Sequence, residues 1–292
     1  MAPSTTIGCG ARCVNTSVHS PSDADRSLYR LFLARLWLFA LLVLCAAGVR
    51  AGELLFAWED EFSAAEQAQV QRWLTATHAA VERYIDPFPF PVRVILHRRD
   101  GASEPTPWAN TWRGQPQSIH FYIDTRFPLE DFLADWTAPH EFSHLILPYL
   151  GRDNSWYAEG FASYLQHSVM VELGVIDEAE ALRRRDRKMQ AAVAVLDDLD
   201  EPMLDRIPEM KRGGSFPTLY WGGAVYFERV DMALREEGSS LQQVLRDFLA
   251  CCRLQRRSLA DLTATLDRVS GTTVFSDEMA MMETAEGVPP RP

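Results

Sequence analysis

The sequence predicts an α+β fold, with a few strands near the N terminus followed by a mostly helical part. Three runs with strand patterns lie before residue 125, and the pattern after residue 129 is mostly helical. Hydrophobic residues make up 47% of the 292 residues, which is enough for a sizeable core. Segregation of strands from helices is typical of α+β domains, whereas parallel folds alternate the two. The chain has no internal repeat and no domain-sized linker.

Each expected element has a local signal. Residues 53–58, 92–97 and 118–124 read as strands, and residues 63–85 read as a helix. Ser63 can cap this helix and Glu66 completes a capping box. The sequence DPFPFP then ends the helix, because proline cannot continue it. The stretch between the second and third strands is rich in proline, glycine and polar residues, which predicts a loop or an irregular sheet edge.

Residues 1–51 have the pattern of an export signal. Three arginines precede the uncharged run 36–49, and small residues follow it. This order favours a secretory signal peptide that is cleaved after Ala51. An uncleaved membrane anchor through residues 31–49 is the alternative, since that segment is nearly as long as a spanning helix. Either interpretation predicts an exported protein, periplasmic or extracellular.

The composition of the chain disfavours some classes of function. The chain has 29 basic and 40 acidic residues and a net charge of -11, which disfavours nucleic-acid binding. Cys251 and Cys252 are neighbours near a helix end, and adjacent cysteines are expected to stay unbonded and buried. We expect one domain over residues 52–277 and a disordered tail over 278–292, which ends in GVPPRP.

Residues 140–144 read HEFSH, an H-E-x-x-H motif. Positions four apart lie on one face of a helix, so His140 and His144 can offer two imidazoles to one metal ion. Glu141 lies one step round the helix, close enough to reach a water on the ion without being a ligand. Pro139 suits the first turn of such a helix.

A catalytic zinc site needs a third protein ligand and an open position. Glu159, in the stretch WYAEGFASYLQ, is the candidate. Surrounding aromatic residues indicate burial, and a buried carboxylate requires a partner such as a metal. Gly160 and Ala162 are small, as is needed where two helices approach closely. His167 is a competing third ligand.

Three segments resemble the gluzincin metallopeptidases, most of all the peptidase MA-like and glycyl-aminopeptidase-like members. They are HEFSH at 140–144, WYAEGFASY at 156–164 and LYWGGAVYFERVDMAL at 219–234. The resemblance covers roughly residues 130–275. It implies a zincin (thermolysin-like) fold, with a small mixed β-sheet packed on the active-site helix and a mostly helical C-terminal part.

The resemblance also implies one Zn²⁺ per chain, held by His140, His144 and Glu159. It implies hydrolysis of peptide bonds in a peptide or protein substrate by a zinc-activated water, with Glu141 as the general base. Tyr220 matches a family tyrosine that helps to bind the oxyanion. A catalytically inactive scaffold protein and a zinc hydrolase with a non-peptide substrate are the alternatives; the intact Glu141 argues against the scaffold.

The substrate-binding residues are less readable from the sequence. In this family an edge strand beside the active-site helix pairs with the extended substrate. Residues 108–117 occupy the corresponding place, which makes Trp108, Asn110 and Trp112 candidates for substrate binding. No GxMEN-like segment is present to bind a free amino terminus, so exopeptidase action is unsupported. His97 and His120 lie on expected strands and are interpreted as structural.

Overall fold

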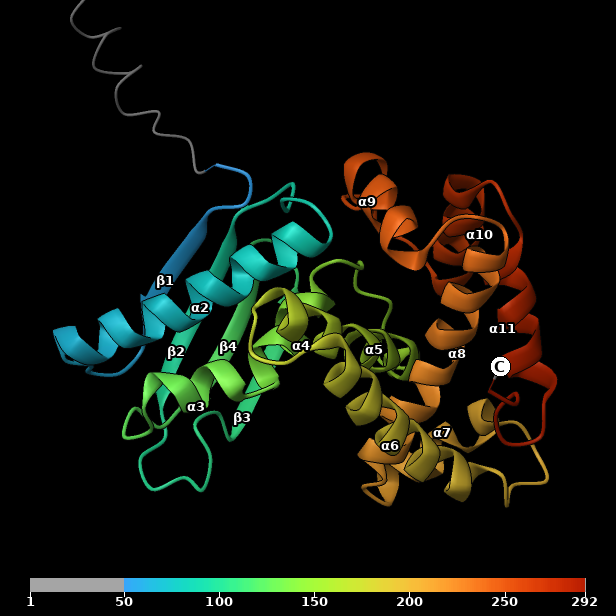
Figure 1. Cartoon of the computed structure of the whole chain (residues 1–292), viewed down its shortest axis with the longest axis horizontal. Coiled ribbons are helices and arrows are strands. Elements are labelled where there is room, and N and C mark those ends of the chain that lie inside the picture. The colour runs from blue at the N-terminus through green and yellow to red at the C-terminus, as the bar shows by residue number, and fades with distance from the viewer. Residues whose placement is uncertain (1–49, 292) are drawn as a thin grey trace, which may run out of the picture. The chain divides into compact units, whose positions relative to one another are not determined.

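A computed structural model describes residues 50–291 (Figure 1). The predicted signal peptide or anchor within residues 1–51 falls almost wholly outside the described residues, as does the proposed membrane segment 31–49. No helix among residues 50–291 combines the length and the apolar character that crossing a bilayer requires.

The sheet has four strands in the order β1-β2-β4-β3. β1, β2 and β4 are parallel, and β3 pairs antiparallel with β4 at one edge. The three predicted strands are confirmed, and β3 lies within the stretch expected to be a loop or an irregular edge. The bounds are Leu54–Trp58 for β1, Val92–Arg98 for β2, Trp108–Arg113 for β3 and Gln117–Ile123 for β4.

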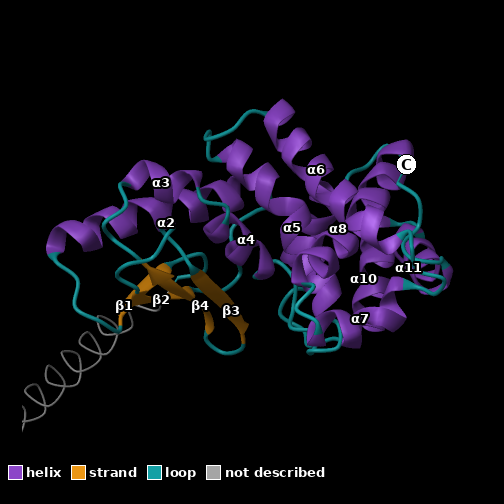
Figure 2. Cartoon of the chain, turned by 90° about the horizontal axis from the view of Figure 1, so that it is seen from below, coloured by secondary structure: helices purple, strands orange, loops and turns teal. Residues whose placement is uncertain are grey.

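Helices form the rest of the described chain, which confirms the α+β prediction. Figure 2 shows α2, α3 and α4 over one face of the sheet. The helices are α2 (Ala64–Tyr84), α3 (Leu129–Ala134), α4 (Thr137–His144), α5 (Ser155–Glu172), α6 (Glu178–Leu196), α7 (Met203–Arg212), α8 (Phe216–Glu236), α9 (Leu241–Cys251), α10 (Leu259–Ser270) and α11 (Val274–Thr284).

Helix α2 joins the sheet to the helical part. Ser63 and Glu66 form the predicted capping box, which satisfies backbone N–H groups that have no partner in the first turn. Its fully buried Trp73 contacts Phe121 of β4 at a ring distance of 5.3 Å and Phe132 of α3 at 4.7 Å. This aromatic cluster packs the sheet against α2 and α3, and Phe121 also lies at a ring distance of 6.3 Å from Phe142 of α4, the helix that carries the HEFSH motif.

Helices α5 and α8 cross at two glycines. A Cβ atom on Gly160 would lie 2.4 Å from the carbonyl carbon of Gly223, and one on Gly223 would lie 2.4 Å from the backbone oxygen of Trp156. These distances are far below van der Waals contact, so only glycine fits. The small residue predicted at Gly160 is therefore required by the crossing that positions Glu159.

Replacing Gly223 by Ala is expected to destabilise the protein by about 1–3 kcal/mol, the usual cost of overpacking. Alanine is ordinarily the better helix former by about 1 kcal/mol, so a loss of stability isolates the steric effect. Urea unfolding measures it. Gly114→Ala is the control, because no atom lies within 4 Å of its added Cβ and it should change stability little. A stabilised Gly223→Ala protein would contradict the crossing geometry.

The C-terminal segment differs from the expected disordered tail over 278–292. Residues up to Thr284 belong to α11, and Arg291 forms ion pairs with Glu228 at 2.5 Å and with Asp186 at 2.8 Å. Glu228 is 8% exposed, so its carboxylate needs such a partner. The expectation of a disordered tail was wrong because it was based on local composition. The contacts of Arg291 join residues 63 or more positions apart, and local composition does not reveal them.

The expectation that Cys251 and Cys252 stay unbonded is also wrong, since they form a disulfide. Helix α9 ends at Cys251, and Cys252 has φ −136°, outside the helical region. This change in backbone direction allows adjacent side chains to meet. Cys251 is exposed and Cys252 partly buried, so the predicted burial is not found either.

Candidate metal centre

The short helix α4 carries the HEFSH motif, and every one of its residues is buried. Pro139 lies in the first turn, as predicted, where its missing N–H has no helical partner to lose. The helix ends at His144. His140 and His144 therefore lie one turn apart, with their ring centroids 4.8 Å apart.

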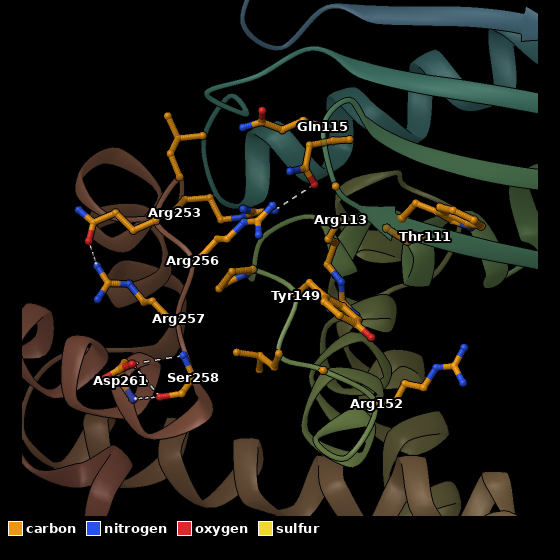
Figure 3. Close-up of a pocket in the computed structure, with 18 of the residues that line it drawn as sticks. Thr111, Arg113, Gln115, Tyr149, Arg152, Arg253, Arg256, Arg257, Ser258 and Asp261 are labelled. Carbon is orange, nitrogen blue, oxygen red and sulfur yellow. Dashed lines mark hydrogen bonds between the residues drawn. The ribbon is translucent and has the colours of Figure 1, made fainter.

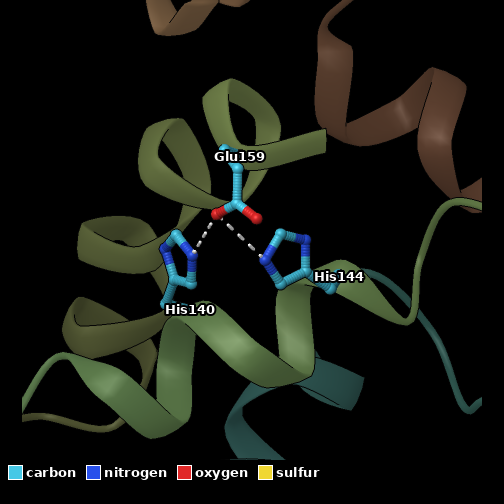
Figure 4. Close-up of side chains that lie close together, drawn as sticks. All are labelled: His140, His144 and Glu159. Atoms are coloured by element: carbon cyan, nitrogen blue, oxygen red, sulfur yellow. Dashed lines mark hydrogen bonds and ion pairs between the residues drawn. The ribbon is translucent and has the colours of Figure 1, made fainter. Parts of the chain in front are cut away.

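Helix α5 brings Glu159 to the two imidazoles (Figure 4). Its Oε2 lies 3.1 Å from Nε2 of His140 and 3.4 Å from Nε2 of His144. The ligand atoms of the three residues all lie within 4.8 Å of one another. Three potential ligands predicted from separate motifs thus converge on one point, a donor set that suits zinc.

The charges at this point also favour a cation. Burial acts to raise the pKa of the Glu159 carboxyl, but the two imidazoles outweigh it and the pKa is lowered. Burial opposes a charge on His140 too, yet Glu159 raises the pKa of this imidazole. Burial lowers the pKa of His144, which favours the neutral form that binds metals. The negative charge of Glu159 and the neutral form of His144 both suit a bound cation.

Gln166 orients His140 and was missed in the sequence. Nδ1 of His140 lies 2.9 Å from Oε1 of Gln166, and Nε2 shares a hydrogen bond of 3.1 Å with Oε2 of Glu159. With its proton on Nδ1, the ring would donate to Gln166 and leave Nε2 to bind a metal ion. Hydrogen bonds of this kind fix the tautomer of histidines that bind metals. Gln166 lies seven residues after Glu159, on the same face of α5, and this spacing is the signal that could have identified it.

Glu141 lies beside the cluster rather than within it. Its side chain is buried at 7% exposure, and the hydroxyl of Thr111 donates to its Oε2 at 2.6 Å. The same hydroxyl lies 2.9 Å from the backbone oxygen of Glu141. Thr111 belongs to β3, so the edge strand fixes the carboxylate. Thr111 was missed because β3 lies in a stretch that the sequence left as loop or edge.

Tyr220 of α8 lies beside His140, with ring centroids 6.3 Å apart. It is partly buried, and burial raises the pKa of its phenol, with further contributions from the Glu159 and Glu141 carboxylates. Tyr220 and Gln166 share the lining of a cavity of about 260 Å³. The hydroxyl stays protonated at neutral pH and can therefore donate a hydrogen bond.

None of the three candidate substrate-binding residues of β3 belongs to the metal cluster. Trp108 and Trp112 are 63% and 61% exposed, and Trp112 contacts His120 on the sheet face that points away from α4. Side chains alternate along a strand, so Thr111 is on the α4 side instead. Asn110 and Trp112 line a larger cavity at the sheet edge, and Trp108 does not.

The other histidines considered in the sequence lie elsewhere. His167 stacks on Trp221 at 5.8 Å and is not part of the cluster. Nε2 of His97 lies 3.0 Å from Nδ1 of His120, and the two rings share a hydrogen bond on the outer face of the sheet. The structure thus favours Glu159 over His167 as the third ligand.

No protein-family model matches the chain, and no curated protein matches it by sequence. The fold is similar to solved M1 zinc metallopeptidases. An M1 zinc metallopeptidase from Deinococcus radiodurans superposes with a TM-score of 0.50 at 14% identity, over 80% of this chain and 48% of that one. A mutant of an M1 zinc metallopeptidase from the same organism, bound to a Tyr-Ser-Ala substrate, gives a TM-score of 0.48 at 13% identity, over 80% and 49%. The chain spans about half the length of these structures.

Proposed function

We propose that this protein is a zinc-dependent metallopeptidase. One observation carries the proposal: His140, His144 and Glu159 converge from two helices, and the carboxylate of Glu141 is held next to them by Thr111. A scaffold protein has no need of a buried carboxylate beside a metal site. The fold similarity to M1 zinc metallopeptidases supports the same reaction class.

His140, His144 and Glu159 would hold the metal, since two imidazoles and a carboxylate form a frequent ligand set of catalytic zinc. When bound, zinc supplies a Lewis acid that polarises the scissile carbonyl and makes water acidic near neutral pH. Gln166 keeps the His140 ring in the tautomer that binds a metal. These residues form a rigid site because both helices are packed in the core.

Glu141 would move the proton. Its carboxylate accepts a proton from the attacking water and returns it to the amine that leaves. Thr111 donates to Oε2, and no other described residue donates to either carboxylate oxygen. Oε1 is therefore the oxygen available to the water. Because Thr111 belongs to β3, a substrate that pairs with this edge strand would be held in register with the base.

Tyr220 would stabilise the oxygen of the scissile carbonyl as it gains negative charge. The phenol is protonated and lies beside His140. We expect Tyr220→Phe to lower kcat by about 10²–10³-fold with little change in KM, the usual effect of removing one donor of this kind. Steady-state kinetics measure it. Tyr122→Phe, on the outer face of the sheet, is the control. A raised KM with an unchanged kcat would assign Tyr220 to substrate binding.

Peptide cleavage by the full chain tests the function directly. The purified protein is incubated with a broad peptide mixture, after chelation and after zinc is added back, and the products are identified by mass spectrometry. We expect cleavage that chelation removes and zinc restores. Bound zinc without cleavage of any peptide would favour the scaffold or the hydrolase of non-peptide substrates. Cleavage that survives complete metal removal would contradict the proposal.

A further inference from the structure

A cavity of about 1060 Å³ lies at the β3 edge of the sheet (Figure 3). Its walls come from the edge strand and following turn, from the segment after α4, and from the connection between α9 and α10. Thr111 links the two sites, since it lines the cavity and also bonds Glu141. A ligand in this cavity can therefore contact the residue that holds the proposed base. The volume is at the upper end for small-molecule sites, which leaves room for a peptide segment.

The cavity is strongly basic although the chain is acidic overall. Asp261 is the one acidic residue in its lining, and that carboxylate already accepts from the hydroxyl and backbone N–H of Ser258. Among residues 50–291, no carboxylate lies within ion-pair distance of any of the five arginines in the lining. These arginines are Arg113, Arg152, Arg253, Arg256 and Arg257.

Arg113 is the unusual member of this set. Its Nε and Nη1 are covered from solvent and hydrogen-bond to no described residue. Burial lowers the pKa of the guanidinium, and the Glu159 and Glu141 carboxylates act against that shift. The Tyr149 ring lies 5.6 Å from the guanidinium carbon. Arg113 thus brings buried donors without partners to the lining of the cavity, close enough to Glu159 and Glu141 to interact with their charges, an arrangement that an anionic ligand would complete.

Arg253 shows how the wall is held. It is 3% exposed, and its Nε donates to the backbone oxygen of Leu145 at 2.7 Å, directly after His144. Nη2 lies 3.3 Å from Oε1 of Gln117. Arg253 therefore fixes the α9–α10 connection, which carries Arg256 and Arg257, to the end of α4. The Arg257 guanidinium itself donates to Thr265 Oγ1 of α10 and to Gln255 Oε1. By contrast, two of the cations around the smaller cavity at Tyr220, Arg184 and Arg187, are paired with Glu180.

We propose that this arginine pocket binds a carboxylate of the peptide substrate, so that the protein prefers acidic peptides; the inference rests on the proposed peptidase function. The carboxylate is an acidic side chain or a free C terminus, because both present the same planar anion to the guanidinium donors. The pocket concentrates positive charge locally, and this offsets the repulsion that an acidic peptide meets from a chain of net charge -11.

Binding to the full-chain Glu141→Gln protein tests the proposal without turnover. Four dansylated pentapeptides are compared by fluorescence: Gly-Ala-Glu-Ala-Glu and Gly-Ala-Gln-Ala-Gln, each as the C-terminal acid and as the amide. We expect at least tenfold tighter binding of a peptide that carries the recognised carboxylate. A preference for Glu over Gln identifies the side chain as the source, and a preference for acid over amide identifies the C terminus.

Arginine variants locate the preference in the pocket. The preference is the ratio of the affinities for the peptides with and without the recognised carboxylate. In the Glu141→Gln background, Arg152→Gln combined with Arg256→Gln should reduce this ratio at least fivefold. Arg113→Gln alone should reduce it by a similar factor. Arg152 and Arg256 are exposed, so their replacement should not disturb folding. Arg268→Gln, an exposed position on α10 outside the pocket, is the matched control and should keep the preference.

Equal affinity for all four peptides would overturn the proposal, as would a preference that survives in both arginine variants. Failure of the peptidase function is a separate result: it would appear as absence of cleavage by the wild-type chain, while the binding preference is measured independently.

Discussion

Glu141→Gln is expected to lower kcat/KM for peptide hydrolysis by about 10²–10⁴-fold while the protein keeps its zinc, because an amide cannot accept a proton from water. The substitution preserves the size of the side chain. The Thr111 hydroxyl can still donate to the amide oxygen in place of Oε2, so the local structure should persist. Steady-state kinetics and zinc analysis of the same preparation provide the two measurements.

The matched control for this change is Glu172→Gln, which removes an exposed carboxylate at the end of α5. It should leave kcat/KM unchanged. If Glu141→Gln hydrolyses peptides at the wild-type rate, Glu141 is not the base. If it loses zinc as well as activity, Glu141 belongs to the metal-binding set, and the separation between ligands and base would be wrong.

Glu159→Ala is expected to abolish stable zinc binding, and hydrolysis with it. The carboxylate is the one negative ligand in the cluster, and two imidazoles leave the ion without its third protein ligand. The loss of zinc affinity should exceed the 10–100-fold typical of residues that only support a ligand. Competition with a chromophoric chelator measures this affinity.

His167→Gln is the control for Glu159→Ala, because His167 is the other candidate third ligand and lies on the same helix. It should keep zinc affinity within a few fold of wild type, since His167 stacks on Trp221 outside the cluster. Loss of zinc in His167→Gln with retention in Glu159→Ala would reverse the ligand assignment.

The residues predicted best from the sequence are those whose spacing is local. The four-residue interval between His140 and His144 fixes their common face, and the small residue at Gly160 indicated the close helix crossing that positions Glu159. Helical periodicity and capping likewise predicted α2 from Ser63 onward. Such features depend on neighbours within a turn or two, and sequence patterns report them directly.

The features that were missed depend on contacts between distant segments. Thr111 bonds Glu141, which lies 30 positions later in the sequence. Side chains alternate between the two faces of β3, and the register of β3 on β4 turns Thr111 rather than Trp112 toward α4. The arginine pocket joins segments from Arg113 to Arg257, and no local pattern links them. The same holds for the ion pair between Arg291 and Glu228. Export through residues 1–51 stays a prediction.

X-ray absorption at the zinc edge of the full-chain protein tests most directly whether His140, His144 and Glu159 hold one zinc ion. We expect one zinc per chain, with nitrogen neighbours from imidazole at about 2.0–2.1 Å and a carboxylate oxygen at about 2.0–2.2 Å. Imidazole scattering should weaken in His144→Ala. A sulfur neighbour at about 2.3 Å, or a folded protein that binds no zinc, would contradict the account.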